Sequence, residues 1–223
     1  MRPIIASFLV FALPAVGLAH FPFIAVEGSG ETARLHGYFG HGAEPTDVKY
    51  FSRLQNGTLL QVPAQGEPTK LAFQPGKISV VAKIPLQQPA AFTFEKNQGL
   101  STRHGNYLSQ TCAKTYSEPA AWTIDTRQQL QLDLVPQTQG DTLQFTAYLK
   151  EKPLANAEIV VENGDNTIEG KTDSEGRFVV STPLQGRTTA RVTHILEQPG
   201  EYNGAQYDGQ RTVTTLLIDL PSK

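Results

Sequence analysis

Five histidines are the residues best suited to chemistry in this chain of 223 residues. Neutral imidazole binds divalent transition metals such as nickel and copper. The sequence has no HExxH zinc motif, no GxSxG nucleophile turn, no phosphate-binding Walker loop and no CxxC pair. Because no acid–base pair or nucleophile is recognisable, we expect metal binding and not an enzyme. The histidines are His20, His36, His41, His104 and His194.

His20 becomes a stronger metal ligand if the chain is cleaved directly after Ala19. Its new α-amine and its ring Nδ1 would then chelate one metal ion together. A second histidine ring would complete a T-shaped site of three nitrogens, the arrangement called a histidine brace. Such nitrogens suit Cu(II) and Ni(II), which favour tetragonal geometry. The other N-terminal chelate needs a histidine at the third position and deprotonated amides, but Pro22 stands there and has no N–H.

His194 lies in an expected strand, 188–196, whose side chains alternate between two faces. This alternation places His194 on the same face as Ala190 and Val192. If that face is the core, His194 is partly buried near the strand end. A histidine there is either a metal ligand or a structural residue that bonds its neighbours, and the sequence leaves both open.

The remaining histidines lie in a turn, a loop and a strand. His41 occupies a glycine-flanked turn and His104 a loop, so both rings are placed to coordinate a metal. His36 shares a strand face with Arg34 and Tyr38, which predicts a solvated side chain. The predicted metal ligands are His20, His194, His41 and His104, and the expected metal is nickel, cobalt or copper.

The first nineteen residues have the pattern of an export signal. Arg2 precedes an apolar run over 4–16, and small residues stand at Gly17 and Ala19. The run is shorter than the ~20 residues that span a bilayer. We therefore expect a cleavable signal peptide over 1–19, a mature chain that begins at His20, a periplasmic or secreted location, and no membrane insertion after cleavage.

Charge and cysteine content exclude further classes. The 19 Lys and Arg residues against 21 Asp and Glu give a formal net charge of −2, so no basic field attracts nucleic acid. Cys112 is the only cysteine, so the chain forms no disulfide within itself. We expect the thiol to be buried and unreactive.

The second half of the chain alternates between apolar and polar residues with clear turns between the segments. The pair Asn163-Gly164 predicts a hairpin turn, and Asp173 to Gly176 predicts a second turn. The strands expected in this half are 143–149, 157–162, 167–172, 177–181, 188–196 and 212–220.

The first half is less regular. The pattern weakens over 99–116, which indicates a longer loop, and 136–140 has the composition of a linker. The strands expected in this half are 33–39, 47–53, 58–62, 70–73, 78–84 and 130–135.

Closely spaced strands without helices between them are typical of antiparallel sandwiches. We therefore predict an all-β protein of two β-sandwich domains, immunoglobulin-like or carboxypeptidase-regulatory-like. The predicted division is a signal peptide over 1–19, an N-terminal sandwich over 20–138 and a C-terminal sandwich over 139–223.

Two segments carry a resemblance to a known fold. Lys152-Pro-Leu-Ala-Asn-Ala-Glu-Ile-Val-Val161 and Lys171-Thr-Asp-Ser-Glu-Gly-Arg-Phe178 resemble the strand–turn–strand unit of the carboxypeptidase-regulatory-like sandwich. Proline presets the first turn of this unit, and aspartate with glycine builds the second. The resemblance implies a fold and leaves the function open.

A wider resemblance covers most of the expected mature chain. The sequence is similar to a family of exported bacterial proteins of poorly defined function, often labelled as periplasmic components of nickel and cobalt uptake systems. That label implies metal handling with a membrane metal transporter as a possible partner. The similar segments are Ala19-His-Phe-Pro-Phe23, Tyr38-Phe-Gly-His41, Arg191-Val-Thr-His194, Gly200-Glu-Tyr-Asn-Gly204, Tyr207 and 214–217.

The sequence thus predicts a periplasmic protein that binds a transition metal for uptake or delivery. A rival hypothesis is a passive structural or interaction sandwich, adhesive or carbohydrate-binding, which needs no metal. A third is a copper oxidase or oxygenase built on a histidine brace. Metal-dependent melting separates the first from the second, because a ligand of the native state stabilises it.

Overall fold

The computed structural model describes residues 20–221 except 45–47, 103–104, 141 and 182. Strands dominate the described residues, which contain short 3-10 helices and no α-helix, so the all-β prediction is confirmed. No described helix has the length and apolar character needed to cross a membrane. The 3-10 helices are η1 (Gly30–Thr32), η2 (Val48–Arg53) and η3 (Pro119–Thr123).

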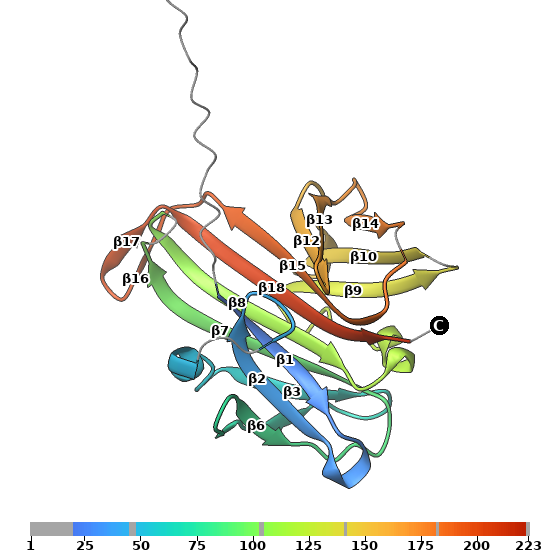
Figure 1. Cartoon of the computed structure of the whole chain (residues 1–223). Helices are drawn as coiled ribbons and strands as arrows, with labels where there is room; N and C mark the ends of the chain where they lie inside the picture. The colour runs from blue at the N-terminus through green and yellow to red at the C-terminus, as the bar shows by residue number, and fades with distance from the viewer. Residues whose placement is uncertain (1–19, 45–47, 103–104, 141, 182, 222–223) are drawn as a thin grey trace, which may run out of the picture.

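A central sheet of eight strands runs through the molecule in the order β13-β12-β15-β18-β8-β7-β3-β4 (Figure 1). The pairs within each half are antiparallel, and the parallel pair β8–β18 joins the two halves. The strands are β3 (Thr58–Pro63), β4 (Thr69–Leu71), β7 (Ala90–Ser101), β8 (Tyr107–Tyr116), β12 (Glu158–Asn163), β13 (Asn166–Lys171), β15 (Gly186–Leu196) and β18 (Gly209–Leu220).

A second sheet, β1-β2-β6-β5, packs on one face of the central sheet. Its β1 places Phe21 and Phe23 against Val213 and Leu217 of β18. Apolar residues of β1, β2 and β6 also pack against β3, β7 and β8. The strands are β1 (Phe21–Glu27), β2 (Arg34–Gly40), β5 (Gln74–Pro75) and β6 (Val80–Lys83).

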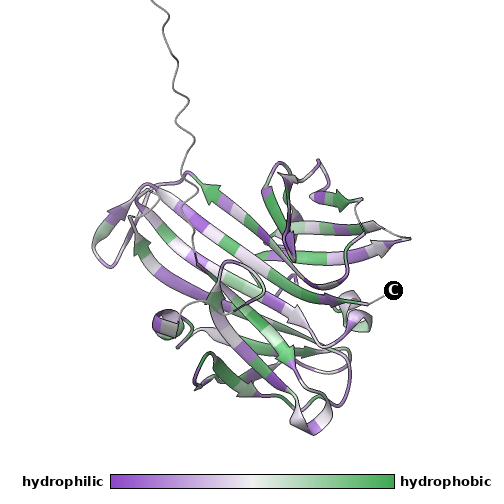
Figure 2. Ribbon diagram, viewed as in Figure 1, coloured by the Kyte–Doolittle hydropathy of each residue, from purple (hydrophilic) through white to green (hydrophobic). Residues whose placement is uncertain are grey.

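A third sheet, built around β10, covers the opposite face of the central sheet. Phe145 of β10 belongs to the same core as Val192 of β15 and Leu216 of β18. Apolar and polar residues alternate along these strands, as Figure 2 shows, which lets each strand bury one face. The strands are β9 (Leu132–Gln139), β10 (Thr142–Leu149), β11 (Lys152–Pro153) and β14 (Arg177–Val180), and a separate hairpin holds β16 (Gly200–Tyr202) and β17 (Ala205–Tyr207).

Both turns predicted in the second half are present. Asn163 pairs with Asn166 across a two-residue turn, in which Gly164 has a φ of 57°. The Asp173 carboxylate accepts hydrogen bonds from the backbone N–H groups of Glu175 and Arg177 and so closes the second turn. Local turn chemistry therefore sets these hairpins.

The prediction of a strand over 47–53 is wrong, since its described residues, Val48–Arg53, form the 3-10 helix η2. Tyr50 and Phe51 are both half-buried and pack against the same core. Consecutive residues of a strand would point to opposite faces, so a helical turn is needed to bury both.

The segment 99–116, predicted to hold a long loop, belongs mostly to the long strands β7 and β8. Its alternation is hidden because several inward positions carry polar residues. Within this segment, Lys114 and Thr115 are each at most 2% exposed, although their side chains are polar. Because these buried residues are polar, a prediction based on the hydrophobic pattern did not find the central strands.

The linker predicted over 136–140 is also wrong, because β9 runs to Gln139 and pairs with β10. Pro136 is tolerated there, since β9 pairs only with β10 among the described strands and its other edge needs no N–H donor. The division predicted between 138 and 139 falls at the end of β9, and the central sheet contains strands from both halves. The count of two domains is therefore not confirmed.

Candidate metal site

Two of the predicted ligands, His20 and His41, lie side by side. His20 directly precedes β1 and His41 directly follows β2. The antiparallel register pairs Phe21 with Gly40, so the next pair outward is His20 with His41. Their ring centroids are 4.2 Å apart, with 48° between the ring planes. Strand pairing thus brings together two imidazoles that are distant in the sequence.

Tyr50 of η2 covers the other side of His20. The ring centroids of Tyr50 and His20 are 5.3 Å apart. The guanidinium of Arg53 and the ammonium of Lys49 each lie 4.8 Å from the centroid of the Tyr50 ring. Sequence reasoning missed Tyr50 as a neighbour of His20, because its segment was predicted to be a strand.

The start of β1 is fixed by the central sheet. Thr215 of β18 is fully buried, and its hydroxyl donates a hydrogen bond of 2.5 Å to the carbonyl of Pro22. The guanidinium of Arg191 covers the Phe21 ring, 4.1 Å from the centroid. These contacts hold the two residues after His20 and so limit where its ring can lie.

His194 is not brought to the other two histidines. It shares a strand face with Ala190 and Val192, which both belong to the core under β10, as the sequence predicted. Arg191 points to the opposite face, where it covers Phe21. His194 therefore lies on the other side of the central sheet from His20.

His194 is partly buried at its place on β15. Burial lowers its pKa, because the charged ring loses solvent. Its Nε2 is buried without a hydrogen-bond partner among the described residues. Its register partner on β18 is Thr212.

Of the other two histidines, the structure describes only His36. His104 lies outside the described residues. His36 is not simply solvated, since its Nδ1 lies 2.9 Å from Ser79 Oγ and its Nε2 lies 3.5 Å from Glu27. Tyr38, expected on a solvated face, is 2% exposed and donates a hydrogen bond to the carbonyl of Ala43.

The described residues contain no group of three or more His, Cys, Asp and Glu side chains that could hold a metal. Cys112 is buried, as predicted, and burial raises its thiol pKa well above the usual value. The carboxylate of Glu95 beside it acts in the same direction. Side chains alone thus supply two imidazoles, and the third donor of a histidine brace would be the His20 α-amine.

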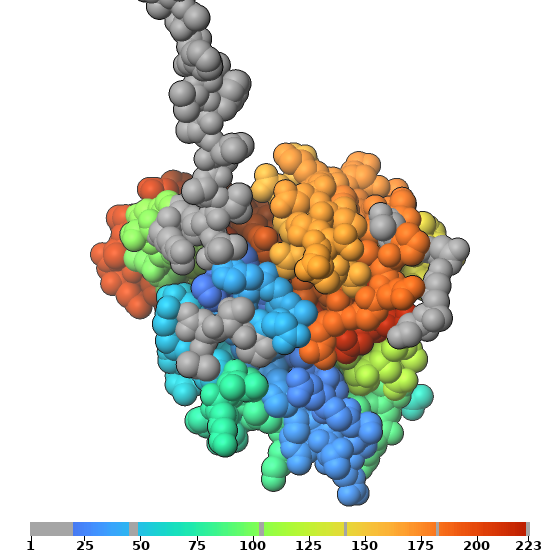
Figure 3. Space-filling model, in the orientation of Figure 1, coloured from blue at the N-terminus to red at the C-terminus, as the bar shows by residue number. Residues whose placement is uncertain are grey.

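Hollows lie on both sides of the histidine pair. One, of about 280 Å³, is bounded by His20, η2 and the ends of β7, β8 and β18. The other, of about 670 Å³, separates the loop after β2 from β12, β13 and β15. In Figure 3 the blue surface of that loop meets the amber surface of β12 and β13.

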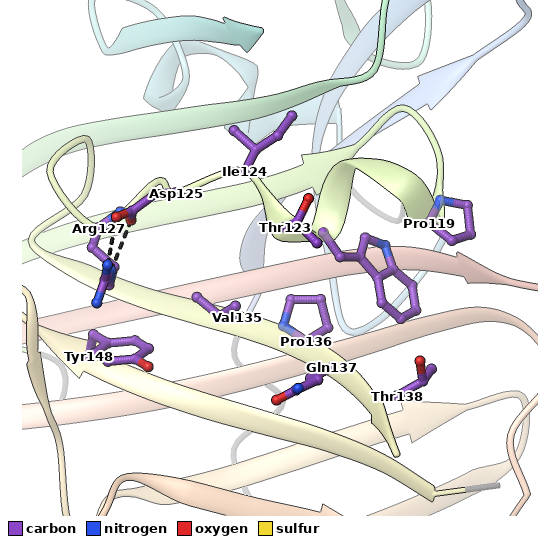
Figure 4. A pocket seen from close by; sticks show the side chains of 11 residues that line it. Pro119, Thr123, Ile124, Asp125, Arg127, Val135, Pro136, Gln137, Thr138 and Tyr148 are labelled. Carbon is purple, nitrogen blue, oxygen red and sulfur yellow. Dashed lines mark hydrogen bonds and ion pairs between the residues drawn. The ribbon is translucent and has the colours of Figure 1, made fainter. Parts of the chain in front are cut away.

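A further groove, of about 430 Å³, lies between η3 and the β9–β10 pair, away from the histidines (Figure 4). Tyr148 and Trp122 line it, but Arg127 covers the Tyr148 ring at 5.3 Å and Trp122 is only 8% exposed. Arg127 is itself held by Asp125, whose pKa its hydrogen bonds lower to about 2. The groove therefore presents no broad flat aromatic surface.

Comparisons with solved structures give only remote likenesses. The FN1–FN3 domains of chicken CNTN1 share 11% identity over 91% of this chain and 69% of that chain, with a TM-score of 0.22. A 1.5-MDa bacterial ice-binding adhesin shares 12% over 91% of this chain and 66% of that chain, with a TM-score of 0.24. A segment of two fibronectin type-III domains from chicken tenascin shares 11% over 87% and 98%, with a TM-score of 0.22. Likeness at this level carries no functional information.

The sequence comparisons are more decisive. No curated protein matches this sequence. Residues 18–195 match the family described as a domain of unknown function, DUF4198. The match includes His20, His41 and His194 and covers most of the chain, so this chain belongs to the DUF4198 family.

Proposed function

We propose that this chain is an exported protein that binds one transition-metal ion, nickel, cobalt or copper, at His20 and His41 for uptake or delivery. The observation that supports the proposal is the distance of 4.2 Å between the two ring centroids. Both residues sit at the same end of one strand pair, so no rearrangement of the fold is needed to bring their nitrogens near each other.

The proposed donor set is the α-amine and ring of His20 with the ring of His41. These three nitrogens match the preference of Cu(II) and Ni(II) for nitrogen ligands in tetragonal geometry. A site with three protein donors leaves coordination positions open, which suits a metal that is passed on. Protons compete with metal for imidazole nitrogen, so we expect metal binding to weaken as the pH falls.

The proposal includes cleavage after Ala19, because only then does His20 carry an α-amine. It also includes a periplasmic or secreted location and a membrane metal transporter as the partner. The resemblance to proteins labelled as nickel and cobalt uptake components favours delivery over storage. Nucleic acid is not proposed as a partner, given the formal net charge of −2.

The test is calorimetric titration of the protein that begins at His20 with Cu(II), Ni(II) and Co(II). We expect the His41→Ala protein to bind metal at least roughly 10–100-fold more weakly. That is the cost of removing a residue that only supports a metal ligand, and His41 is proposed as a ligand itself. His194→Ala is the matched control, since His194 lies on the opposite face of the central sheet, and it is expected to bind as the parent does. Equal affinity of the His41→Ala protein and the parent for every metal would contradict the proposed ligand set.

The passive interaction module remains the alternative from another class. Carbohydrate binding would need exposed flat aromatic rings, and the groove in Figure 4 keeps Tyr148 under Arg127 and Trp122 in the core. A third alternative is a copper oxidase. If the copper-loaded protein produces peroxide when a reductant is added, it is an oxidase, because a protein that only binds copper would not do so.

A further inference from the structure

The hollow of about 280 Å³ beside His20 is lined by two arginines. Arg53 enters it from η2, and Arg211 enters it from β18. No aspartate or glutamate is among the residues that line it. Among the described residues, the hollow therefore has two guanidiniums and no carboxylate to balance them.

Arg211 is partly buried, and none of the described carboxylates forms an ion pair with it. On β18 it stands opposite Ser109 of the neighbouring β8, on the face toward β1. Burial lowers its pKa, and the positive charge of Arg191 acts in the same direction. Within the described part of the chain no carboxylate pairs with Arg211. A buried charge without a partner is unfavourable unless a ligand supplies the opposite charge.

The backbone of Arg53, at the opposite wall of the hollow, is held by a side-chain hydrogen bond. The side-chain amide of Gln98 donates to the carbonyl of Arg53 at 3.2 Å and to the hydroxyl of Thr111 at 2.9 Å. The Arg53 guanidinium also lies over the Tyr50 ring. The end of η2 is thus tied to β7 and β8, and the exposed Arg53 side chain rests on the Tyr50 ring.

The rest of the lining fits a small organic acid. Hydroxyls of Ser101 and Ser109 offer hydrogen bonds, while Phe39 and Leu100 offer apolar surface for a carbon skeleton. A guanidinium fork matches a carboxylate in geometry and charge. We propose that this hollow binds a small organic di- or tricarboxylate between Arg53 and Arg211.

The proposal stands apart from the metal site, since its charges come from arginines and not from histidines. His20 lies at the edge of the same hollow. A metal ion held by His20 would be repelled by the two guanidiniums, and a bound carboxylate would offset that repulsion. If both ligands bind, each strengthens the other by the same factor.

The experiment is calorimetric titration of the metal-free protein that begins at His20, at low ionic strength. Citrate and succinate probe the organic acid, while inorganic phosphate and sulfate probe a plain oxyanion. We expect stoichiometric binding of citrate or succinate and at least about a tenfold loss of affinity in Arg211→Gln. Arg177→Gln is the charge-matched control, because Arg177 is exposed and pairs with Asp173 and Glu175.

Arg53→Gln provides a second variant on the opposite wall, and urea unfolding checks that each variant is folded. Removal of an unpaired charge is not expected to lower the free energy of unfolding of Arg211→Gln. The proposal is overturned if neither citrate nor succinate binds, if only phosphate or sulfate binds, or if both variants bind as the parent does. Because metal is absent throughout, none of these outcomes depends on the His20–His41 site.

Discussion

His194 and His41 have the same side chain but different chemistry, because their strands place them differently. His41 lies in the loop after β2, with its ring beside His20. His194 lies on the core face of β15, where loss of solvent lowers its pKa. The sequence identified both as candidates and placed His194 on the same strand face as Ala190 and Val192, which is the core face. It could not separate them, because that requires knowing which face of which sheet each one occupies.

The lowered pKa of His194 has a consequence for stability. The unfolded chain takes up a proton at this residue near pH 6.5, whereas the folded chain does so only at lower pH. The unfolded state therefore binds more protons as pH falls below about 6.5, and the native state loses stability over that range. We expect His194→Gln to reduce the loss of unfolding free energy between about pH 7.5 and 5.5, measured by urea denaturation. An unchanged pH dependence would show that His194 does not contribute.

At the scale of elements, β1 determines the site, and it was not among the predicted strands. Its Phe21 and Phe23 pack against β18, while Ile24 packs toward β7 on the other side. A strand that is buried on both faces does not alternate between apolar and polar residues. In the sequence, β1 therefore looks like a continuation of the apolar segment before it. The strands with one polar face, such as β10, β12 and β15, were predicted because alternation survives in them.

The hydrogen bond from Thr215 to Pro22 is predicted to position the start of β1. Thr215→Val keeps the shape but leaves the Pro22 carbonyl without its donor, at a cost of about 1–3 kcal/mol in unfolding free energy. We also expect weaker metal binding, because His20 is two residues away. Calorimetric metal titration and urea denaturation measure the two effects.

Thr115→Val is the matched control for this prediction. Thr115 is also buried and donates to the carbonyl of Leu217, within the central sheet. It should lose similar stability, about 1–3 kcal/mol, and keep the parent's affinity for metal. Equal metal affinity in the two variants would mean that Thr215 does not position His20.

At the scale of the whole molecule, buried polar groups tie the layers together. Lys114 of β8 is 1% exposed, and its Nζ lies 2.5 Å from a carboxylate oxygen of Asp133 on β9. Thr126 accepts from Lys114 and donates to Asp133. Burial alone would lower the Lys114 pKa, but the attraction and hydrogen bond of Asp133 outweigh it and raise the Lys114 pKa above its usual value. Such buried polar residues interrupt the alternation of apolar and polar side chains. For this reason β7 and β8 were not predicted from the sequence.

Lys114→Met would leave the Asp133 carboxylate buried without its partner. We expect a loss of about 3–5 kcal/mol in the free energy of unfolding, measured by urea denaturation. Replacing both residues, as Lys114→Met with Asp133→Leu, removes the isolated charge and should restore most of that loss. A double variant as unstable as the single one would show that packing around the pair, and not its charge, sets the stability.

The central claim is that His20, as the first residue, forms a metal site with His41. Its most direct test compares the protein that begins at His20 with the same chain carrying one extra residue before it, by titration with Cu(II) and Ni(II). We predict one bound ion per mature chain and a loss of at least about tenfold in affinity with the extension, since an internal His20 has no α-amine. Equal binding by both proteins, or no binding by either, would contradict the claim.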